Sequence, residues 1–342
     1  LNNYAKILDN SVDGAIMGIP VHMPVHILTF LLTITYSALV TILCFCLAYP
    51  LAFYLSKVVS PRSLPTLFLM LFVPLMLGQA FHDPAMVARR IMGFLCFGLV
   101  ASATYLFNDM NDLEADRAHM GKRHRALASG RLSLVKGAGL GAAMLLAGIV
   151  GAVILSPGFA LVVLCYLALT LAYSLWLKAQ PLLDVMVIGG LFTLRVQAGV
   201  ELAEQPQSLW LTSFAMILFG SLALAKRHAE LIRAGAEGRT IAGRGYLASD
   251  TPLTVSLGIA TAAMSVLVML FYMQFDVAGK GLYNDPQRLF FVPLVLGSWL
   301  IRIWVKAHRG TLHDDPVVFA LKDKASWLHG AMVAMCWLAA VA

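Results

Sequence analysis

The feature that most constrains this chain is a series of apolar stretches, each about twenty residues long and poor in charge. A helix needs about 20 mostly apolar residues to cross the hydrocarbon core of a bilayer. Ten stretches meet this requirement, at about residues 27–55, 64–81, 86–107, 132–156, 158–177, 181–202, 208–225, 252–275, 289–305 and 325–342. The sequence therefore predicts an all-α integral membrane protein built as a bundle of transmembrane helices.

The composition agrees with this prediction. The chain is 60% hydrophobic and 13% charged, whereas about 25% of the residues in a soluble domain are charged. This difference excludes a disordered chain, a disulfide-rich secreted domain and an ordinary cytosolic enzyme. The first twenty residues lack a charged start followed by an apolar core, so we expect no cleavable signal peptide.

The distribution of basic residues predicts the orientation of the bundle. Fifteen of the 25 Lys and Arg residues lie in four alternate loops, at 108–131, 178–180, 226–251 and 306–324. Because base-rich loops stay in the cytoplasm, we expect these four on the cytoplasmic side of a bacterial inner membrane. The same rule explains the net charge of +7 without a nucleic-acid partner. Arg89 and Arg90, near the opposite face, do not follow it.

The densest acidic segment follows the apolar stretch at 86–107. Asp109, Asp112 and Asp116 are spaced i, i+3 and i+7, which places three carboxylates on one helical face with Asn108 beside them. Like charges at this spacing repel one another unless a cation lies between them. Mg²⁺ is a hard cation that binds carboxylates together with substrate phosphates. The motif therefore predicts a Mg²⁺ site.

A basic cluster comes directly after the acidic motif. Lys122, Arg123 and Arg125 could bind the phosphates of the same substrate. The alternative interpretation is a solvated helix end, in which the acidic residues pair with Arg117 and Lys122. The complete acidic motif at a membrane face, followed by a basic cluster, favours the metal site.

The spacing Asn108-Asp109-x-x-Asp112-x-x-x-Asp116 resembles the first aspartate-rich motif of the UbiA superfamily of intramembrane prenyltransferases. The continuation from Lys122 to Gly130 resembles the loop of its decaprenyl-phosphate phosphoribosyltransferase branch. The resemblance covers about residues 65–342. It implies nine transmembrane helices around a central cavity, with Mg²⁺ bridging the motif to a diphosphate. The stretch at 27–55 is then one extra N-terminal transmembrane helix.

A second polar group lies where ordinary prenyltransferases of this family carry another acidic motif. Here Lys226 and Arg227 are followed by a single carboxylate, Glu230, which is similar to the phosphoribosyltransferase branch. This change favours direct contact between cations and phosphate oxygens over a second Mg²⁺. The alternative is that these residues are only the positive charges expected at a cytoplasmic helix end.

The remaining candidate binding residues are Tyr173, Lys178, Asp184 and Arg195, a pattern that again resembles the phosphoribosyltransferase branch. Ionisable residues within a span are costly and usually face a cavity or one another. Asp184 and Arg195 therefore either line the substrate pocket or form an ion pair in its wall. The segment from Gly243 to Tyr246 is interpreted as a turn, and the segment from Asp314 to Asp323 as a solvated loop.

The first residues do not fit the same family. The stretches at 2–8 and 48–57 resemble a spermidine/putrescine-type ABC transporter permease. We therefore expect two parts, an N-terminal extension over residues 1–60 with the extra transmembrane helix, and a transferase domain over residues 61–342. Whether the extension is a natural addition or a junction of two genes stays open.

Together, the residues and the resemblance predict a Mg²⁺-dependent transferase that acts on a polyprenyl phosphate or diphosphate lipid. In the form implied by the phosphoribosyltransferase branch, the phosphorylated small-molecule donor is 5-phosphoribosyl diphosphate and the acceptor is a polyprenyl phosphate. One alternative keeps the fold but moves a polyprenyl group from its diphosphate to an aromatic or lipid acceptor. An alternative of another class is an ABC transporter permease subunit.

Overall fold

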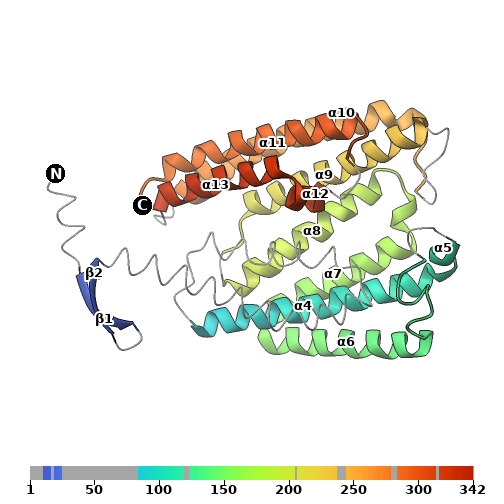
Figure 1. The fold of residues 1–342 in the computed structure, drawn as a ribbon, viewed down its shortest axis with the longest axis horizontal. Helices are drawn as coiled ribbons and strands as arrows, with labels where there is room; N and C mark the ends of the chain where they lie inside the picture. The colour runs from blue at the N-terminus through green and yellow to red at the C-terminus, as the bar shows by residue number, and fades with distance from the viewer. Residues whose placement is uncertain are drawn as a thin grey trace.

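The protein is described by a computed structural model over residues 11–16, 19–24, 84–118, 123–204, 206–236, 244–278, 283–312 and 316–341. Long helices dominate this part of the chain (Figure 1). They are α4 (Pro84–Asn111), α6 (Leu134–Leu155), α7 (Pro157–Leu175), α8 (Leu183–Leu202), α9 (Leu209–Ala236), α10 (Thr251–Phe271), α11 (Phe291–His308) and α13 (Lys324–Val341). Shorter elements connect them: α5 (Leu113–Ala118), η1 (Leu177–Ala179), η2 (Ala248–Asp250), η3 (Tyr272–Val277), η5 (Pro286–Phe290) and α12 (Pro316–Lys322).

The long helices agree with the predicted spans. Each of the last eight stretches, from 86–107 to 325–342, corresponds to one long helix. In the part of the chain that the structure describes, seven helices are long and apolar enough to cross a membrane. The predicted spans at 27–55 and 64–81 lie outside the described residues, so the full helix count stays a prediction. The all-α membrane architecture is confirmed for the residues described from Pro84 onward.

Near the N-terminus, a two-stranded antiparallel hairpin pairs β1 (Ser11–Ile16) with β2 (Ile19–Pro24). The sequence analysis did not anticipate strands in this segment. The rest of the N-terminal extension lies outside the described residues, so its boundary at residue 60 and its permease resemblance stay predictions.

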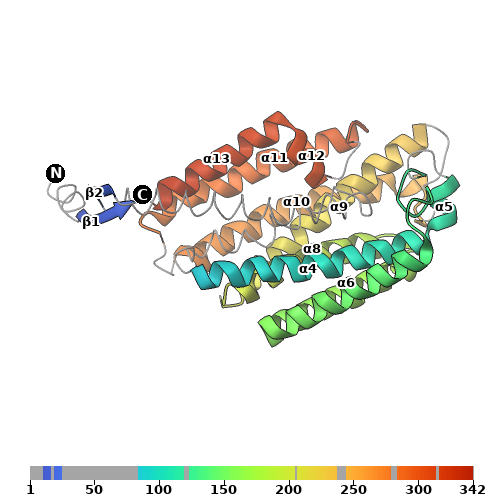
Figure 2. The same ribbon diagram turned by 60° about the horizontal axis from the view of Figure 1, so that its bottom comes forward.

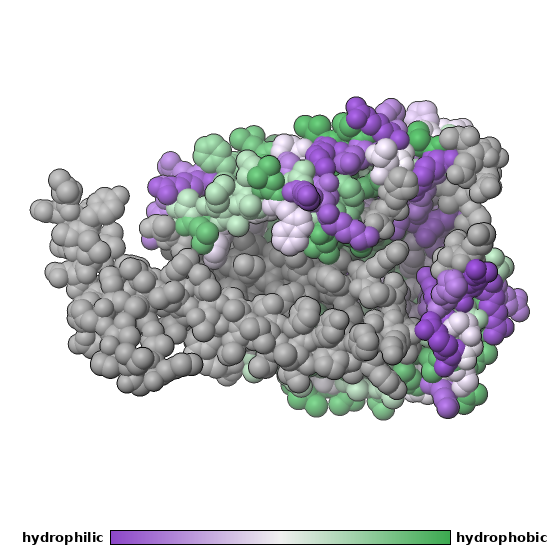
Figure 3. Space-filling view, in the orientation of Figure 1, coloured by the Kyte–Doolittle hydropathy of each residue, from purple (hydrophilic) through white to green (hydrophobic). Residues whose placement is uncertain are grey.

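Successive long helices run in alternating directions (Figures 1 and 2). This course places α5, η1 and the C-terminal ends of α9 and α11 toward one end of the bundle, which we call the base-rich end. Hydrophilic residues gather around α5 at this end in Figure 3. Arg89 lies at the other end, where it pairs with Glu204 and donates to the Leu155 carbonyl oxygen at 2.8 Å. These contacts explain why Arg89 is found at this end, where the charge pattern does not predict a basic residue.

The helices α4 and α6 pack side by side (Figures 1 and 2) through small residues. The buried residues of α6 include Gly137, Gly141, Gly148 and Ala152. A Cβ atom added at Gly148 would lie 2.8 Å from the Cys96 carbonyl oxygen of α4, so glycine is required for this approach. Small residues allow close packing of helices in membranes, where water does not drive their association.

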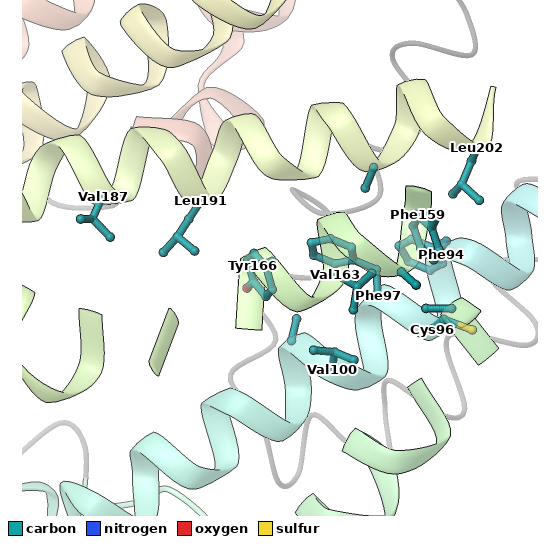
Figure 4. Packing of buried hydrophobic residues seen from close by; sticks show 14 residues of the cluster. Phe94, Cys96, Phe97, Val100, Phe159, Val163, Tyr166, Val187, Leu191 and Leu202 are labelled. Carbon is teal, nitrogen blue, oxygen red and sulfur yellow. The ribbon is translucent and has the colours of Figure 1, made fainter. Parts of the chain in front are cut away.

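Two of the hydrophobic clusters in the described residues share the helix α8. The first joins α4, α7 and α8, and Figure 4 shows Phe97, Val100, Phe159 and Val163 packed within it. The second joins α8, α9, α10 and α11, and Trp304 lies within it. Because α8 belongs to both clusters, the ends of α4, α8 and α9 are fixed relative to one another.

The outer surface of the bundle is apolar along its length. Several large hydrophobic side chains point away from the protein, including Val135, Ile154 and Leu209. In a soluble protein such extensive exposure would be a liability. Around a helix bundle of this kind, it is the surface that lipid chains cover.

Candidate functional site

The acidic motif lies at the base-rich end, where α4 gives way to α5. The helix does not continue without interruption, because Asp112 forms a turn between the end of α4 and the start of α5. The helical hydrogen-bond pattern still persists across the turn, since Asp112 N–H donates to the Asn108 carbonyl at 2.9 Å and Asp116 N–H donates to the Asp112 carbonyl at 2.8 Å. The expected spacing along the chain is therefore retained, but the three carboxylates do not meet at one point.

Two of the three carboxylates converge on a single cationic atom. Arg125 Nη1 donates to Asp109 Oδ1 at 2.8 Å and to Asp116 Oδ2 at 2.7 Å. The Asp109 and Asp116 side chains are only 13% and 2% exposed, whereas Arg125 is 33% exposed. Arg125 thus approaches the acidic pair from the solvent side and offsets part of its negative charge.

The third carboxylate of the motif points elsewhere. Asp112 accepts a hydrogen bond from the Asn108 side-chain amide at 3.1 Å and an ion-paired contact from Lys178 Nζ at 3.4 Å. Lys178 belongs to η1, so Asp112 links the acidic motif to the connection between α7 and α8. Asn108 and Lys178 therefore both contact the motif, and the contact of Lys178 is one that its grouping with Tyr173, Asp184 and Arg195 did not predict.

The acidic pair suits a divalent cation by its chemistry. Among the described residues, no group of three or more His, Cys, Asp and Glu side chains is arranged to hold a metal. Asp109 and Asp116 nevertheless present two hard oxygen ligands to one positively charged point. Mg²⁺ commonly binds through one or two carboxylates and completes its shell with water and substrate phosphates. The residues present therefore fit Mg²⁺ bound together with a diphosphate.

The basic cluster after the motif is only partly described. Lys122 lies outside the described residues, so its predicted role stays a prediction. Arg123 is exposed in the same loop. The neighbours of Arg125, Ala126 and Leu127, are buried and anchor the loop beside the acidic pair.

A second cluster forms around Asp184 at the start of α8. This carboxylate is fully buried and receives hydrogen bonds from Arg227 Nε at 2.7 Å and from the Tyr246 hydroxyl at 2.6 Å. Arg244 Nη1 lies 3.6 Å from the same carboxylate, and Arg227 also pairs with Glu230. The cluster therefore joins α8 to α9 and to the loop before α10.

Arg227 was expected to contact phosphate directly, and the structure gives it a different environment. Its side chain is 2% exposed and its guanidinium is committed to Asp184 and Glu230. Lys226 is half-buried on the same helix. A buried ion pair is stable only when its hydrogen bonds are satisfied, which the Tyr246 hydroxyl helps to achieve here.

The loop before α10 contributes residues that the sequence analysis missed. The segment interpreted as a turn is docked against η1 and α8, because a Cβ atom at Gly245 would lie 2.4 Å from the Ala179 carbonyl oxygen. Gly245 also has a φ of +62°, which glycine adopts readily. The Tyr246 hydroxyl accepts from Leu182 N–H at 2.8 Å. The glycine before the buried tyrosine is the signal that could have revealed this docking.

Tyr246 and Arg244 are both held by polar contacts in this loop. Burial, together with the hydrogen bond to Asp184, raises the pKa of the Tyr246 hydroxyl above its usual value. Arg244 donates to the Tyr173 hydroxyl at 2.7 Å, which connects the loop to α7. Tyr173 thereby contacts the second cluster, and its predicted role in substrate binding stays a prediction.

Arg195 does not pair with Asp184. Eleven residues separate the two on α8, which is about 16 Å along the helix axis. Arg195 instead donates to the Tyr166 hydroxyl at 3.1 Å, and its guanidinium lies 4.7 Å from the Phe192 ring centroid. The interpretation of Asp184 and Arg195 as an ion pair is therefore wrong. Asp184 is bound by Arg227 of α9, and Arg195 is bound to Tyr166 of α7.

The segment interpreted as a solvated loop contains an ordered ion pair. Arg302 of α11 donates to both oxygens of Asp323 at 2.6 and 2.7 Å, and this contact lowers the pKa of Asp323. Ser326 N–H also donates to Asp323 at 2.8 Å, so the carboxylate caps the start of α13. Asp314 lies outside the described residues.

Comparison with known proteins shows the family and the fold of the chain. The UbiA prenyltransferase family matches residues 66–322. An uncharacterized protein of Sinorhizobium fredii, y4nM, is 50% identical over 273 residues, which is 80% of this chain and 53% of that protein. The chain thus spans about half the length of this relative.

Two further matches cover most of both chains. Decaprenyl-phosphate phosphoribosyltransferase of Mycobacterium tuberculosis is 32% identical over 291 residues, which is 83% of this chain and 92% of that protein. The structure of a UbiA homolog from Archaeoglobus fulgidus bound to DMAPP and Mg²⁺ has a TM-score of 0.61 at 15% identity. It covers 80% of this chain and 94% of that chain, which shows a shared fold.

Proposed function

The chain belongs to the UbiA prenyltransferase family and is a membrane transferase, and from this premise we propose that it transfers a 5-phosphoribosyl group from phosphoribosyl diphosphate to a polyprenyl phosphate. The similarity to a decaprenyl-phosphate phosphoribosyltransferase, at 32% identity, supports this donor and acceptor. The base-rich end of the bundle is the proposed site of the reaction.

The observation that carries the proposal is the composition of the second cluster. Arg227 forms ion pairs with both Asp184 and Glu230, which leaves this cluster no spare carboxylate for a second metal. Lys178 and Arg244 add further positive charge around η1. Phosphoribosyl diphosphate carries phosphates at both ends of the sugar, whereas a prenyl diphosphate has one polar end. One acidic pair, together with the cations around η1, therefore matches a donor that carries phosphate at both ends.

In the proposed site, Asp109 and Asp116 hold Mg²⁺, with Asp112 orienting Lys178 beside them. Bound Mg²⁺ would neutralise the charge that develops on the departing diphosphate. Arg123, Arg125 and Lys122 bind oxygens of that diphosphate.

The cations around η1, together with Lys226, bind the phosphate at the other end of the donor. An oxygen of the lipid phosphate forms a bond to the anomeric carbon while the bond from that carbon to the diphosphate breaks, and the diphosphate leaves. No protein nucleophile is required.

Two residues of the second cluster act without touching the substrate in this proposal. Asp184 is fully buried and Arg227 is almost so. They hold the start of α8 against α9 and fix Arg244 and Tyr246 in the loop. Arg195 lies farther along α8, where its hydrogen bond to Tyr166 joins α8 to α7, and a place in the substrate pocket stays a prediction for it.

The donor can be tested directly. Membranes containing the protein are incubated with Mg²⁺, a polyprenyl phosphate and radiolabelled phosphoribosyl diphosphate, and the lipid fraction is extracted and counted. We expect label in the lipid fraction, and we expect Asp109→Asn to lose it while remaining in the membrane. Absence of label with the unaltered chain, in membranes where a known phosphoribosyltransferase gives label, would reject the proposal.

Prenyl transfer is the second candidate, because the Archaeoglobus fulgidus structure with this fold binds DMAPP and Mg²⁺. The same assay with a radiolabelled prenyl diphosphate and an aromatic acceptor separates the two reactions. Label that enters the acceptor from the prenyl diphosphate, and none from phosphoribosyl diphosphate, would select this alternative.

A further inference from the structure

The acidic pair contains a carboxylate that needs a positive partner at all times. Asp116 has a side chain that is 2% exposed, and leaving a buried charge uncompensated is strongly destabilising. Arg125 is a cationic partner of Asp116 through Nη1, and the same atom also contacts Asp109. Arg125 therefore stands at the point where the proposed metal would bind.

We propose that Arg125 is an internal substitute for the metal, which leaves the acidic pair when Mg²⁺ and a diphosphate bind together. This inference rests on the proposed function, since it concerns the same site. Mg²⁺ binds oxygen ligands at about 2.0–2.1 Å. The nitrogen of Arg125 lies 2.7 and 2.8 Å from the two oxygens, so both cations cannot occupy the pair at once.

The loop is built so that the side chain of Arg125 can move while its backbone stays. Ala126 and Leu127 are buried, and Ser129 N–H donates to the Arg125 carbonyl at 2.9 Å. The guanidinium, in contrast, is one-third exposed at the site opening. A diphosphate bound beside the acidic pair offers this guanidinium a bidentate partner in place of the carboxylates.

The exchange makes metal binding depend on the substrate. Without a diphosphate, Mg²⁺ has to displace Arg125 into water, which weakens its binding. With a diphosphate present, Arg125 gains a new partner as the metal enters. The two ligands therefore strengthen each other's binding, and this coupling is equal in both directions. Arg125 positions the donor only after the metal has replaced it.

The first test measures metal binding alone, using Mn²⁺ as the probe and electron paramagnetic resonance of the purified full chain in detergent. Because Arg125→Gln removes the competing cation, we expect Mn²⁺ to bind about tenfold more tightly than to the unaltered chain. The matched control is Arg131→Gln in the same loop, since Arg131 contacts Ser129 and the His124 carbonyl and neither carboxylate. Unchanged or weaker Mn²⁺ binding by Arg125→Gln would overturn the inference.

The second test measures thermal unfolding with and without Mg²⁺. In the chelator EDTA, Arg125→Gln removes the guanidinium that Asp109 and Asp116 share, so we expect a lower unfolding temperature that Mg²⁺ restores. Arg125→Lys keeps a positive charge and should depend less on Mg²⁺. An Arg125→Gln chain that fails to fold even with Mg²⁺ would contradict the inference, because the metal should replace the missing guanidinium.

A third measurement separates this inference from the choice of donor. Radiolabelled inorganic diphosphate is bound to immobilised protein at saturating Mg²⁺ and in EDTA. We expect Mg²⁺ to increase retention strongly for the unaltered chain and less for Arg125→Gln. If retention changes in this way but no phosphoribosyl group is transferred, the proposed donor is rejected and the role of Arg125 is kept. Phosphoribosyl transfer with equal Mg²⁺ enhancement in both chains would reject only the role of Arg125.

Discussion

At the scale of single residues, many of the charged groups inside the described part of this bundle are paired with groups of opposite charge. Asp184 is fully buried with Arg227, and Asp116 is held by Arg125. Arg195 has no such carboxylate contact in the described part of the chain and instead lies over aromatic rings. Ionisable groups in a membrane are costly unless paired in this way. These pairs therefore fix which helices can be neighbours at the base-rich end.

Tyr246 gives a prediction at this scale. Tyr246→Phe removes the donor to Asp184 Oδ1 and the acceptor for Leu182 N–H. Leaving a buried carboxylate oxygen without its hydrogen bond costs about 1–3 kcal/mol. We expect a lower unfolding temperature in detergent near neutral pH. Tyr105→Phe, at an exposed position on α4, should change it much less. Equal effects of the two substitutions would contradict this role.

The pH dependence of the same substitution follows from the raised pKa of Tyr246. An unfolded chain releases the tyrosine proton near pH 10, whereas the folded chain retains it to higher pH. The stabilising contribution is therefore complete below pH ~10 and declines above it. We expect the stability difference between the unaltered chain and Tyr246→Phe to shrink as the pH rises past this value. A difference that grows there would contradict the assignment.

At the scale of helices, hydropathy predicted where the spans lie but not where the helices end. The stretch at 208–225 corresponds to α9, which continues to Ala236. The apolar stretch ends where charged residues begin. The helix continues farther, because backbone hydrogen bonds and side-chain pairs such as Arg227 with Glu230 support it. The turn at Asp112 and the π-helical segment η3 also lacked a hydropathy signal.

The packing of α4 against α6 provides a prediction for this scale. Gly148→Ala places a Cβ atom 2.8 Å from a backbone oxygen of α4, which the helices can relieve only by moving apart. Overpacking of this kind costs about 1–3 kcal/mol. We expect a lower unfolding temperature for Gly148→Ala than for Gly139→Ala, since no atom lies within 4 Å of a Cβ at Gly139. Equal stability of the two variants would show that α4 and α6 do not require a glycine at position 148.

At the scale of the whole molecule, the sequence predicted the location of the site better than its contacts. The acidic motif and its basic loop could be recognised because their residues are close along the chain. The pairing of Asp184 with Arg227 and Tyr246 joins residues up to 62 positions apart, so it depends on which helices pack together. No local pattern distinguishes that arrangement from an ion pair with Arg195. The role of Arg227 could be recognised only from the folded chain.

The orientation of the bundle in the membrane is the last prediction. The structure brings the base-rich loops to one end, and such loops stay in the cytoplasm. In a chain whose own cysteines are replaced, Ser129→Cys marks the base-rich end and Gln207→Cys marks the opposite end; both positions are exposed. Intact spheroplasts are treated with a membrane-impermeant maleimide. We expect it to label Gln207→Cys at once and Ser129→Cys only after the membrane is permeabilised.

The same pair of variants controls for reactivity, because both cysteines should label fully after permeabilisation. Labelling of Ser129→Cys in intact spheroplasts, with Gln207→Cys protected, would reverse the orientation. The proposed site would then face away from the cytoplasm, and its phosphorylated donor would have to be supplied from the other side of the membrane. The basic residues that predict the topology include the cations that we propose to bind phosphate, so a reversed orientation would count against both assignments.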